Sequence, residues 1–261
     1  MKPMSWGEHI TSKLEGHVLV VTIDKPPFNH VSVDLMSDLA LCLEAGDKEP
    51  RVRASVIQSD GKAFCAGADF ANPNDSVGGG MKGINALYVQ AVRLFSIEKP
   101  IVAAVQGAAV GAGLGLAMVA DFRVASPEAR FAANFVKLAF HPGFGLTHTL
   151  PRAIGEHRAN LMFLTGRRVK AEDGLGWGLV DEIAPAAELR EAALRLAGEI
   201  AENAPLAVVA TRKTLRGDLA AAVREQTDHE HIQQTALRAT DDFQEGVRAV
   251  AERRAGAFQG R

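Results

Sequence analysis

Runs of apolar, β-branched residues alternate with amphipathic segments along the first half of the chain. Residues 18–23 form such a run and end at two prolines, which predicts a strand, and residues 10–14 predict its hairpin partner. Apolar side chains at helical spacing predict a helix over residues 33–43, with Ser32 as its N-cap. Residues 52–57 predict another buried strand, so the pattern is that of an α/β protein.

The stretch from 101 to 121 has a different character, because small residues fill its middle. It reads IVAAVQGAAVGAGLGLAMVAD, which predicts a short buried strand, a glycine-rich turn and an apolar helix beginning near Gly111. The first N–H groups of a helix lack partners and carry the positive end of its dipole. The turn is therefore a candidate site for a negatively charged oxygen.

A second glycine-rich turn follows the strand at 52–57. Residues 61–70 read GKAFCAGADF and present a row of backbone amides at a turn. Three consecutive glycines and Pro73 in residues 71–83 predict a mobile flap beside a site, and a helix is expected over 84–97.

The C-terminal half is dominated by helical patterns. Helices are expected over residues 153–164, 171–177 and 205–215, with a strand at 179–183 and further helices after 186. We divide the chain into a core, residues 1–200, and a helical region, residues 201–261. The final helix carries an apolar stripe, which either packs on the chain's own core or forms a subunit interface; its members are Phe243, Val247, Val250 and Ala251.

Composition excludes several classes of function. The chain of 261 residues has 29 basic and 31 acidic side chains, so there is no charge excess to indicate nucleic acid or a membrane surface as a partner. The longest apolar run, residues 108–120, is too short to cross a bilayer, and the N-terminus has no apolar signal core. With two separate cysteines, we expect a soluble, reduced, cytoplasmic protein without a metal site.

Four motifs resemble the enoyl-CoA hydratase/isomerase, or crotonase, family from about residue 10 to the C-terminus. They read GKAFCAGADF, AVQGAAVGAGLGLAMVADFRVAS, LTGRRVKAEDGLGWGLVDEIAP and DDFQEGVRAVAERRAGAFQGR. The resemblance implies an α/β fold with a ββα spiral core and a helical C-terminal trimerisation region, in a homotrimer or a dimer of trimers. It also implies an acyl-CoA substrate and no tightly bound cofactor, since CoA arrives as part of the thioester.

Family members stabilise a thioester enolate with two backbone N–H groups. By position, the resemblance assigns these donors to Ala68 and Ala112. Preorganised donors at a developing oxyanion are an effective means of lowering a reaction barrier. The resemblance also implies a set of CoA-binding positions: Lys25, Phe28, Ala66, Gly67, Asp69 and Gly111.

The acid and base positions of the family are where this sequence departs from it. Gly115 and Phe135 stand at the positions of the two hydratase glutamates, and Gly143 stands where isomerases commonly have a carboxylate. None of these residues can transfer a proton, so ordinary hydration is in doubt. His141 is the nearest titratable candidate for acid/base catalysis, and the alternative is that it faces solvent or a subunit interface.

Several functions remain open at this point. An acyl-CoA enzyme with altered chemistry, such as a decarboxylase or thioester hydrolase, competes with a non-catalytic acyl-CoA binder or partner subunit. A dinucleotide oxidoreductase is disfavoured, because Leu116 stands at the third glycine position of a G-x-G-x-x-G pattern.

Overall fold

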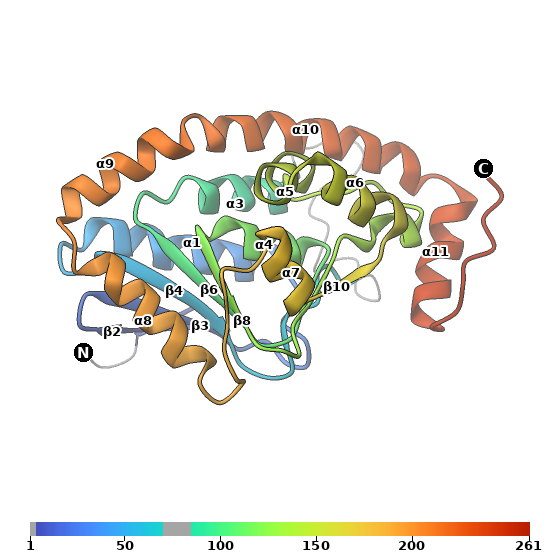
Figure 1. Ribbon diagram of the computed structural model, residues 1–261. Helices are drawn as coiled ribbons and strands as arrows, with labels where there is room; N and C mark the ends of the chain where they lie inside the picture. The colour runs from blue at the N-terminus through green and yellow to red at the C-terminus, as the bar shows by residue number, and fades with distance from the viewer. Residues whose placement is uncertain (1–3, 70–84) are drawn as a thin grey trace.

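The computed structural model describes residues 4–69 and 85–261, and its core is a spiral (Figure 1). Three successive segments each contribute a long strand to one sheet, a short strand to a second sheet, and then a helix. The segments are β4 (Ala54–Ser59), β5 (Ala63–Cys65) and α3 (Ala86–Phe95); β6 (Ile101–Val105), β7 (Ala108–Val110) and α4 (Ala112–Val119); and β8 (Phe122–Ala125), β9 (Arg130–Ala132) and the 3₁₀ helix η1 (Asn134–Leu138).

The larger sheet has the strand order β1-β2-β3-β4-β6-β8-β11. Its antiparallel edge consists of β1 (Met4–Trp6), β2 (Ile10–Glu15) and β3 (Val18–Ile23), which confirms the predicted hairpin. From β3 to β11 (Glu182–Ile183) all neighbours are parallel. The smaller sheet has the order β10-β9-β7-β5, where β10 is Arg168–Lys170.

Helices cover both faces of the larger sheet, which explains why its central strands are apolar almost throughout. Val20, Val56 and Val102 pack against α8 (Leu189–Ala201) on one face. Alternate residues such as Val21 and Ile57 face the main core, which includes α1 (Val33–Lys48), α3 and α4. Figure 1 shows α8 on the opposite side of the sheet from α1 and α4.

The remaining helices surround this core. They are α5 (Leu146–Ile154), α6 (Glu156–Thr165), α7 (Ala171–Trp177), α9 (Pro205–Arg216), α10 (Leu219–Arg238) and α11 (Asp241–Ala251). In Figure 1, α9 and α10 follow one another along one side of the molecule, and α11 turns away at their end. Helix α10 packs against α3 and α5, and α11 packs against η1.

Some predicted elements require correction. The single helix expected over 153–164 is two helices, because the backbone turns at Gly155 between α5 and α6. The strand expected at 179–183 is reduced to β11, since the N–H of Leu179 bonds to Gly174 at the end of α7. The Ser32 cap is confirmed by its bond to the N–H of Leu35. The predicted flap at 71–83 lies outside the described residues.

Candidate active site

The two glycine-rich turns meet at the ends of β5 and β7, which are neighbouring parallel strands of the smaller sheet. Gly67 has a φ of +88°, a conformation that side chains disfavour. A Cβ on Gly67 would lie 2.6 Å from the carbonyl oxygen of Val110 and 3.6 Å from the nitrogen of Ala112. Glycine is therefore required for this close approach, which brings the amide of Ala112 beside the turn at 66–68.

Ala68 and Ala112 supply the backbone amides of this junction. Ala112 is the first residue of α4, so its N–H has no intrahelical partner, and the N-cap Gly111 offers no side-chain cap. Within residues 4–69 and 85–261, no group accepts a hydrogen bond from the N–H of either Ala68 or Ala112. The turn at Ala68 is held by Val31, whose N–H donates to the carbonyl of Gly67 at 2.9 Å. The junction thus presents two positioned donors.

Both alanines line a cavity of about 520 Å³. The structure also brings the predicted CoA-binding residues Phe28, Ala66, Gly67, Asp69 and Gly111 to its wall. Much of the remaining wall is apolar, and four phenylalanine rings contribute to it: Phe28, Phe135, Phe140 and Phe144. A cavity with apolar walls and few polar groups strengthens electrostatic interactions with a ligand.

Two predicted site residues do not line this cavity. The ring of His141 lies against that of His229, with 6.1 Å between centroids, and its Nδ1 is 2.8 Å from the carbonyl oxygen of Pro142. Burial lowers the pKa of His141 below the ordinary imidazole value, with a smaller contribution from His229. Lys25 lines a separate polar hollow beside the start of α1.

Apolar rings stand near both positions that the resemblance assigns to glutamates. A Cβ on Gly115 would lie 2.6 Å from Cδ1 of Phe144, so the ring of Phe144 fills the space where a side chain at 115 would begin. Phe135 is 8% exposed, and its Cζ is 3.7 Å from the position of a Cβ on Gly111. The cavity wall near Gly111 therefore includes the ring of Phe135, and the ring of Phe144 lies beside Gly115.

The position of the isomerase carboxylate is filled by a polar pair instead. A Cβ on Gly143 would lie 2.0 Å from the hydroxyl oxygen of Tyr88 and 2.5 Å from Nε2 of Gln234. The Tyr88 hydroxyl donates to Oε1 of Gln234 at 2.7 Å, and Nε2 of Gln234 donates to the carbonyl of His141 at 2.9 Å. Burial raises the pKa of Tyr88 well above its usual range, so the phenol is uncharged.

The sequence did not identify Tyr88 and Gln234 as site residues. They are 146 positions apart, on α3 and α10, and meet only through tertiary packing. A tyrosine on a helix with an otherwise apolar face also fits a core position, so no local signal separates the two roles. Arg238 of α10, a further lining residue, was missed as a site residue for the same reason.

Covalent catalysis by the neighbouring cysteine is not supported. Cys65 ends β5 immediately before the turn, but burial raises the pKa of its thiol to about 12, which keeps it protonated and poorly nucleophilic. Among the described residues, no three His, Cys, Asp or Glu side chains gather as metal ligands. No helix in that part of the chain is both long and apolar enough to span a membrane.

Comparison with known proteins shows that this chain is similar, over nearly its whole length, to members of one family. Residues 13–261 match the profile of the enoyl-CoA hydratase/isomerase family. An (E)-benzylidenesuccinyl-CoA hydratase from Thauera aromatica is 33% identical over 96% of this chain and 99% of its own length. Among solved structures, an enoyl-CoA hydratase/isomerase from Pseudoalteromonas atlantica T6c is 30% identical, with a TM-score of 0.86 over 97% of this chain and all of its own. A carnitinyl-CoA hydratase from Mycobacterium avium is 32% identical, with a TM-score of 0.86 over 97% and 99%.

Proposed function

Because this chain belongs to the enoyl-CoA hydratase/isomerase family, which acts on CoA thioesters through the crotonase fold, we propose that the cavity binds an acyl-CoA with its thioester oxygen between the N–H groups of Ala68 and Ala112. The observation that carries this proposal is the junction of the two glycine-rich turns. It leaves both N–H groups without an acceptor among the described residues and places both at the cavity wall.

The two donors supply the chemistry that an acyl-CoA reaction needs. Removal of a proton or a carboxylate beside the thioester leaves negative charge on the carbonyl oxygen. Each preorganised donor in a dry site is worth about 3 to 4 kcal/mol of barrier. The start of α4 at Ala112 adds the positive end of a helix dipole to the same oxygen.

The reaction we propose uses this enolate without the two-glutamate relay for water. Decarboxylation is favoured by the apolar wall, because loss of CO₂ from a carboxylate next to the thioester forms the enolate without a catalytic base, and the enolate then takes a proton from solvent to give the shortened acyl-CoA. Thioester hydrolysis is the second candidate: water close to Phe135 would attack the carbonyl carbon, the two amides would stabilise a tetrahedral oxyanion in place of an enolate, and CoA would leave as the thiol. The absence of a carboxylate at 115, 135 and 143 also keeps the non-catalytic acyl-CoA binder as an alternative.

A substitution at Ala68 tests the proposed pair of donors. Ala68→Pro removes one N–H, and we expect turnover of an acyl-CoA substrate to fall by about 10²- to 10³-fold. Ala68→Ser keeps the N–H and serves as the matched control, with activity near that of the unmodified protein. Circular dichroism confirms that each variant is folded. Full activity in folded Ala68→Pro contradicts the assignment, and tight binding of every tested thioester without turnover supports the binder.

The hydration of crotonyl-CoA tests the altered acid/base chemistry. We expect a rate about 10²-fold or more below that of a two-glutamate enzyme, since positioned acid/base groups typically contribute about 10²- to 10⁴-fold. Phe135→Glu returns one carboxylate to the wall and is expected to raise this rate. His141→Gln measures any contribution of the histidine. Fast hydration by the unmodified protein contradicts the argument from the missing carboxylates.

A further inference from the structure

Arg238 is a cation on the wall of the same cavity, at the last position of α10. Its guanidinium carbon lies 5.3 Å from the ring centroid of Phe140 and 5.6 Å from that of Phe243. The side chain is about half buried, and burial lowers its pKa. The guanidinium thus lies against a pair of packed aromatic rings, whose centroids are 5.0 Å apart, and is partly removed from water.

Within the described part of the chain, no carboxylate forms an ion pair with Arg238. The buried arginines elsewhere are arranged differently, since Arg123 pairs with Asp181, and Arg212 and Arg216 share Asp121. A cation that is partly desolvated without an anion is unfavourable, whereas a ligand anion that reaches it forms a strong, charge-assisted bond. Arg238 is therefore poised to bind an anion that enters the cavity.

We propose that Arg238 binds a carboxylate on the acyl group, so that the substrate is the CoA monothioester of a dicarboxylic acid. This rests on the proposed function, because the thioester must occupy the two amides. Gln234 lies one helical turn before Arg238, but its amide is already engaged by Tyr88 and by the carbonyl of His141. The planar guanidinium can donate hydrogen bonds to both oxygens of a carboxylate, and a neutral acyl chain has no such acceptors.

The phosphates of CoA are the other possible source of this anion. The acyl carboxylate fits the surroundings better, because the guanidinium lies against the rings of Phe140 and Phe243 in a cavity whose wall also includes Val247. A strongly hydrated phosphate loses more solvation there than a single carboxylate does. The two sources are separable by experiment, since free CoA carries the phosphates and lacks an acyl group.

Isothermal titration calorimetry with saturated thioesters of matched length tests the proposal. The carboxylated probes are succinyl-, glutaryl-, adipoyl- and pimeloyl-CoA, and the neutral probes are butyryl-, valeryl-, hexanoyl- and heptanoyl-CoA. We expect at least one carboxylated probe to bind about tenfold or more tightly than its neutral partner. Arg238→Met keeps a side chain against Phe140 and is expected to abolish this preference.

Arg224→Met is the matched control, because Arg224 is on the same helix, exposed, and does not line this cavity. Equal binding of both series, or a preference that survives in Arg238→Met, overturns the proposal. An equal loss of affinity for free CoA and for all thioesters in Arg238→Met assigns the arginine to a phosphate and also overturns it. If the neutral thioesters bind and Ala68→Pro weakens their binding, the proposed function stands even if a carboxylate on the acyl group adds no affinity. If no thioester binds, both proposals fail.

Discussion

Gly115 lies within α4, with the ring and Cβ of Phe144 packed against its Cα. A helical glycine usually gains stability on substitution by alanine. Here the new methyl would lie 2.6 Å from Cδ1 and 2.7 Å from Cβ of Phe144, so the ring and backbone must move. We expect Gly115→Ala to lower the free energy of unfolding by about 1 to 3 kcal/mol, measured by urea denaturation.

Gly198 provides the control for this substitution. It lies in α8, and no described atom comes within 4 Å of the position of its Cβ. Gly198→Ala is expected to raise the free energy of unfolding by roughly 0.5 to 1 kcal/mol. A stabilised Gly115→Ala would show that Phe144 moves easily. The same packing means that Gly115→Glu alone does not rebuild a hydratase site.

Glu230 is a fully buried carboxyl on α10 that caps the start of α5. It accepts hydrogen bonds from the N–H of Gly145 at 2.8 Å and the N–H of Thr147 at 3.1 Å. Burial raises its pKa from 4.5 to about 7, against the opposing effect of these bonds. The folded state therefore retains this proton at pH values where the unfolded chain has lost it.

This difference predicts a loss of stability as the pH rises. Below about 4.5 both states are protonated, and between about 4.5 and 7 the unfolded state binds fewer protons, so its ionisation favours unfolding. The resulting loss in the free energy of unfolding approaches roughly 3 kcal/mol and is constant above pH 7. The glutamine of Glu230→Gln cannot ionise. The free energy of unfolding of this variant, measured by urea denaturation from about pH 4.5 to 7, should therefore fall less than that of the unmodified protein. Parallel pH curves for the two proteins would contradict the raised pKa.

At the scale of single residues, only part of the candidate site could be predicted from the sequence. Ala68 and Ala112 line the cavity, and each follows a glycine in a glycine-rich turn that is visible in the sequence, while their role as donors stays a prediction. Tyr88, Gln234 and Arg238 were missed, because their part in the wall depends on how α3 and α10 pack. Their roles depend on tertiary contacts between segments far apart in the sequence.

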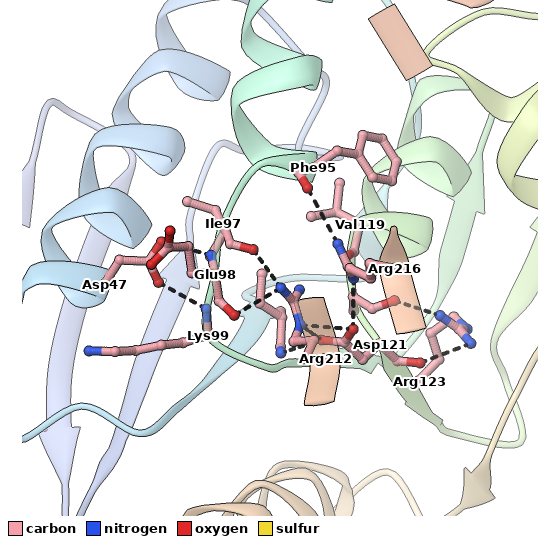
Figure 2. A network of polar contacts seen from close by, with 12 residues as sticks. Asp47, Phe95, Ile97, Glu98, Lys99, Val119, Asp121, Arg123, Arg212 and Arg216 are labelled. Atoms are coloured by element: carbon pink, nitrogen blue, oxygen red, sulfur yellow. Dashed lines mark hydrogen bonds and ion pairs between the residues drawn. The ribbon is translucent and has the colours of Figure 1, made fainter. Parts of the chain in front are cut away.

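At the scale of elements, Asp121 connects α4, whose first residue is Ala112, to the C-terminal helices. Figure 2 shows its carboxylate between Arg212 and Arg216 of α9, with N–O distances of 2.9 Å to each. Arg216 also donates to the carbonyl of Val119 at 2.7 Å, at the end of α4. Helix α9 thereby fixes the C-terminus of α4, whose N-terminus presents the amide of Ala112.

Removing the charge of Asp121 should break this connection. Asp121→Asn leaves two largely buried guanidinium groups without their anion, and we expect the free energy of unfolding to fall by about 3 to 5 kcal/mol. Asp60→Asn breaks an exposed ion pair with Arg190 and should change the free energy of unfolding by less than about 1 kcal/mol. Guanidinium chloride competes with ion pairs, so urea is the denaturant for this comparison. Equal effects of the two substitutions would show that the buried network contributes little.

The elements themselves were predictable where their borders carry local signals. β3 ends before prolines and α9 lies between Pro205 and Gly217, and both matched the expected ranges closely. The three-residue strands β5, β7 and β9 were not predicted, since they are too short to show alternation and exist through pairing with one another. The repeated strand-strand-helix unit of the spiral was hidden for that reason.

At the scale of the whole molecule, the apolar stripe of the last helix is partly used within the chain, while Val250 stays 41% exposed. Phe243 and Val247 pack against the main core, and Val247, Val250 and Ala251 line the cavity. These contacts favour packing on the chain's own core over a subunit interface as the role of the stripe. The argument for an oligomer therefore moves to α9 and α10, which expose Leu206, Leu215 and Ile232 to 85%, 76% and 64%.

We predict a homotrimer or a dimer of trimers in which these leucines and Ile232 are covered by neighbouring subunits. Large apolar side chains that are strongly exposed on neighbouring helices are typical of an interface, and cyclic closure would bury them in every copy. Sedimentation velocity at micromolar concentration should give a trimeric or hexameric species, and Leu206→Glu with Leu215→Glu should shift it towards monomer. Leu164→Glu, on α6 and 76% exposed, is the control that leaves the assembly intact. A stable monomer in the unmodified protein would contradict the prediction. Dissociation by Leu164→Glu alone would instead move the interface from α9 and α10 to the α6 side.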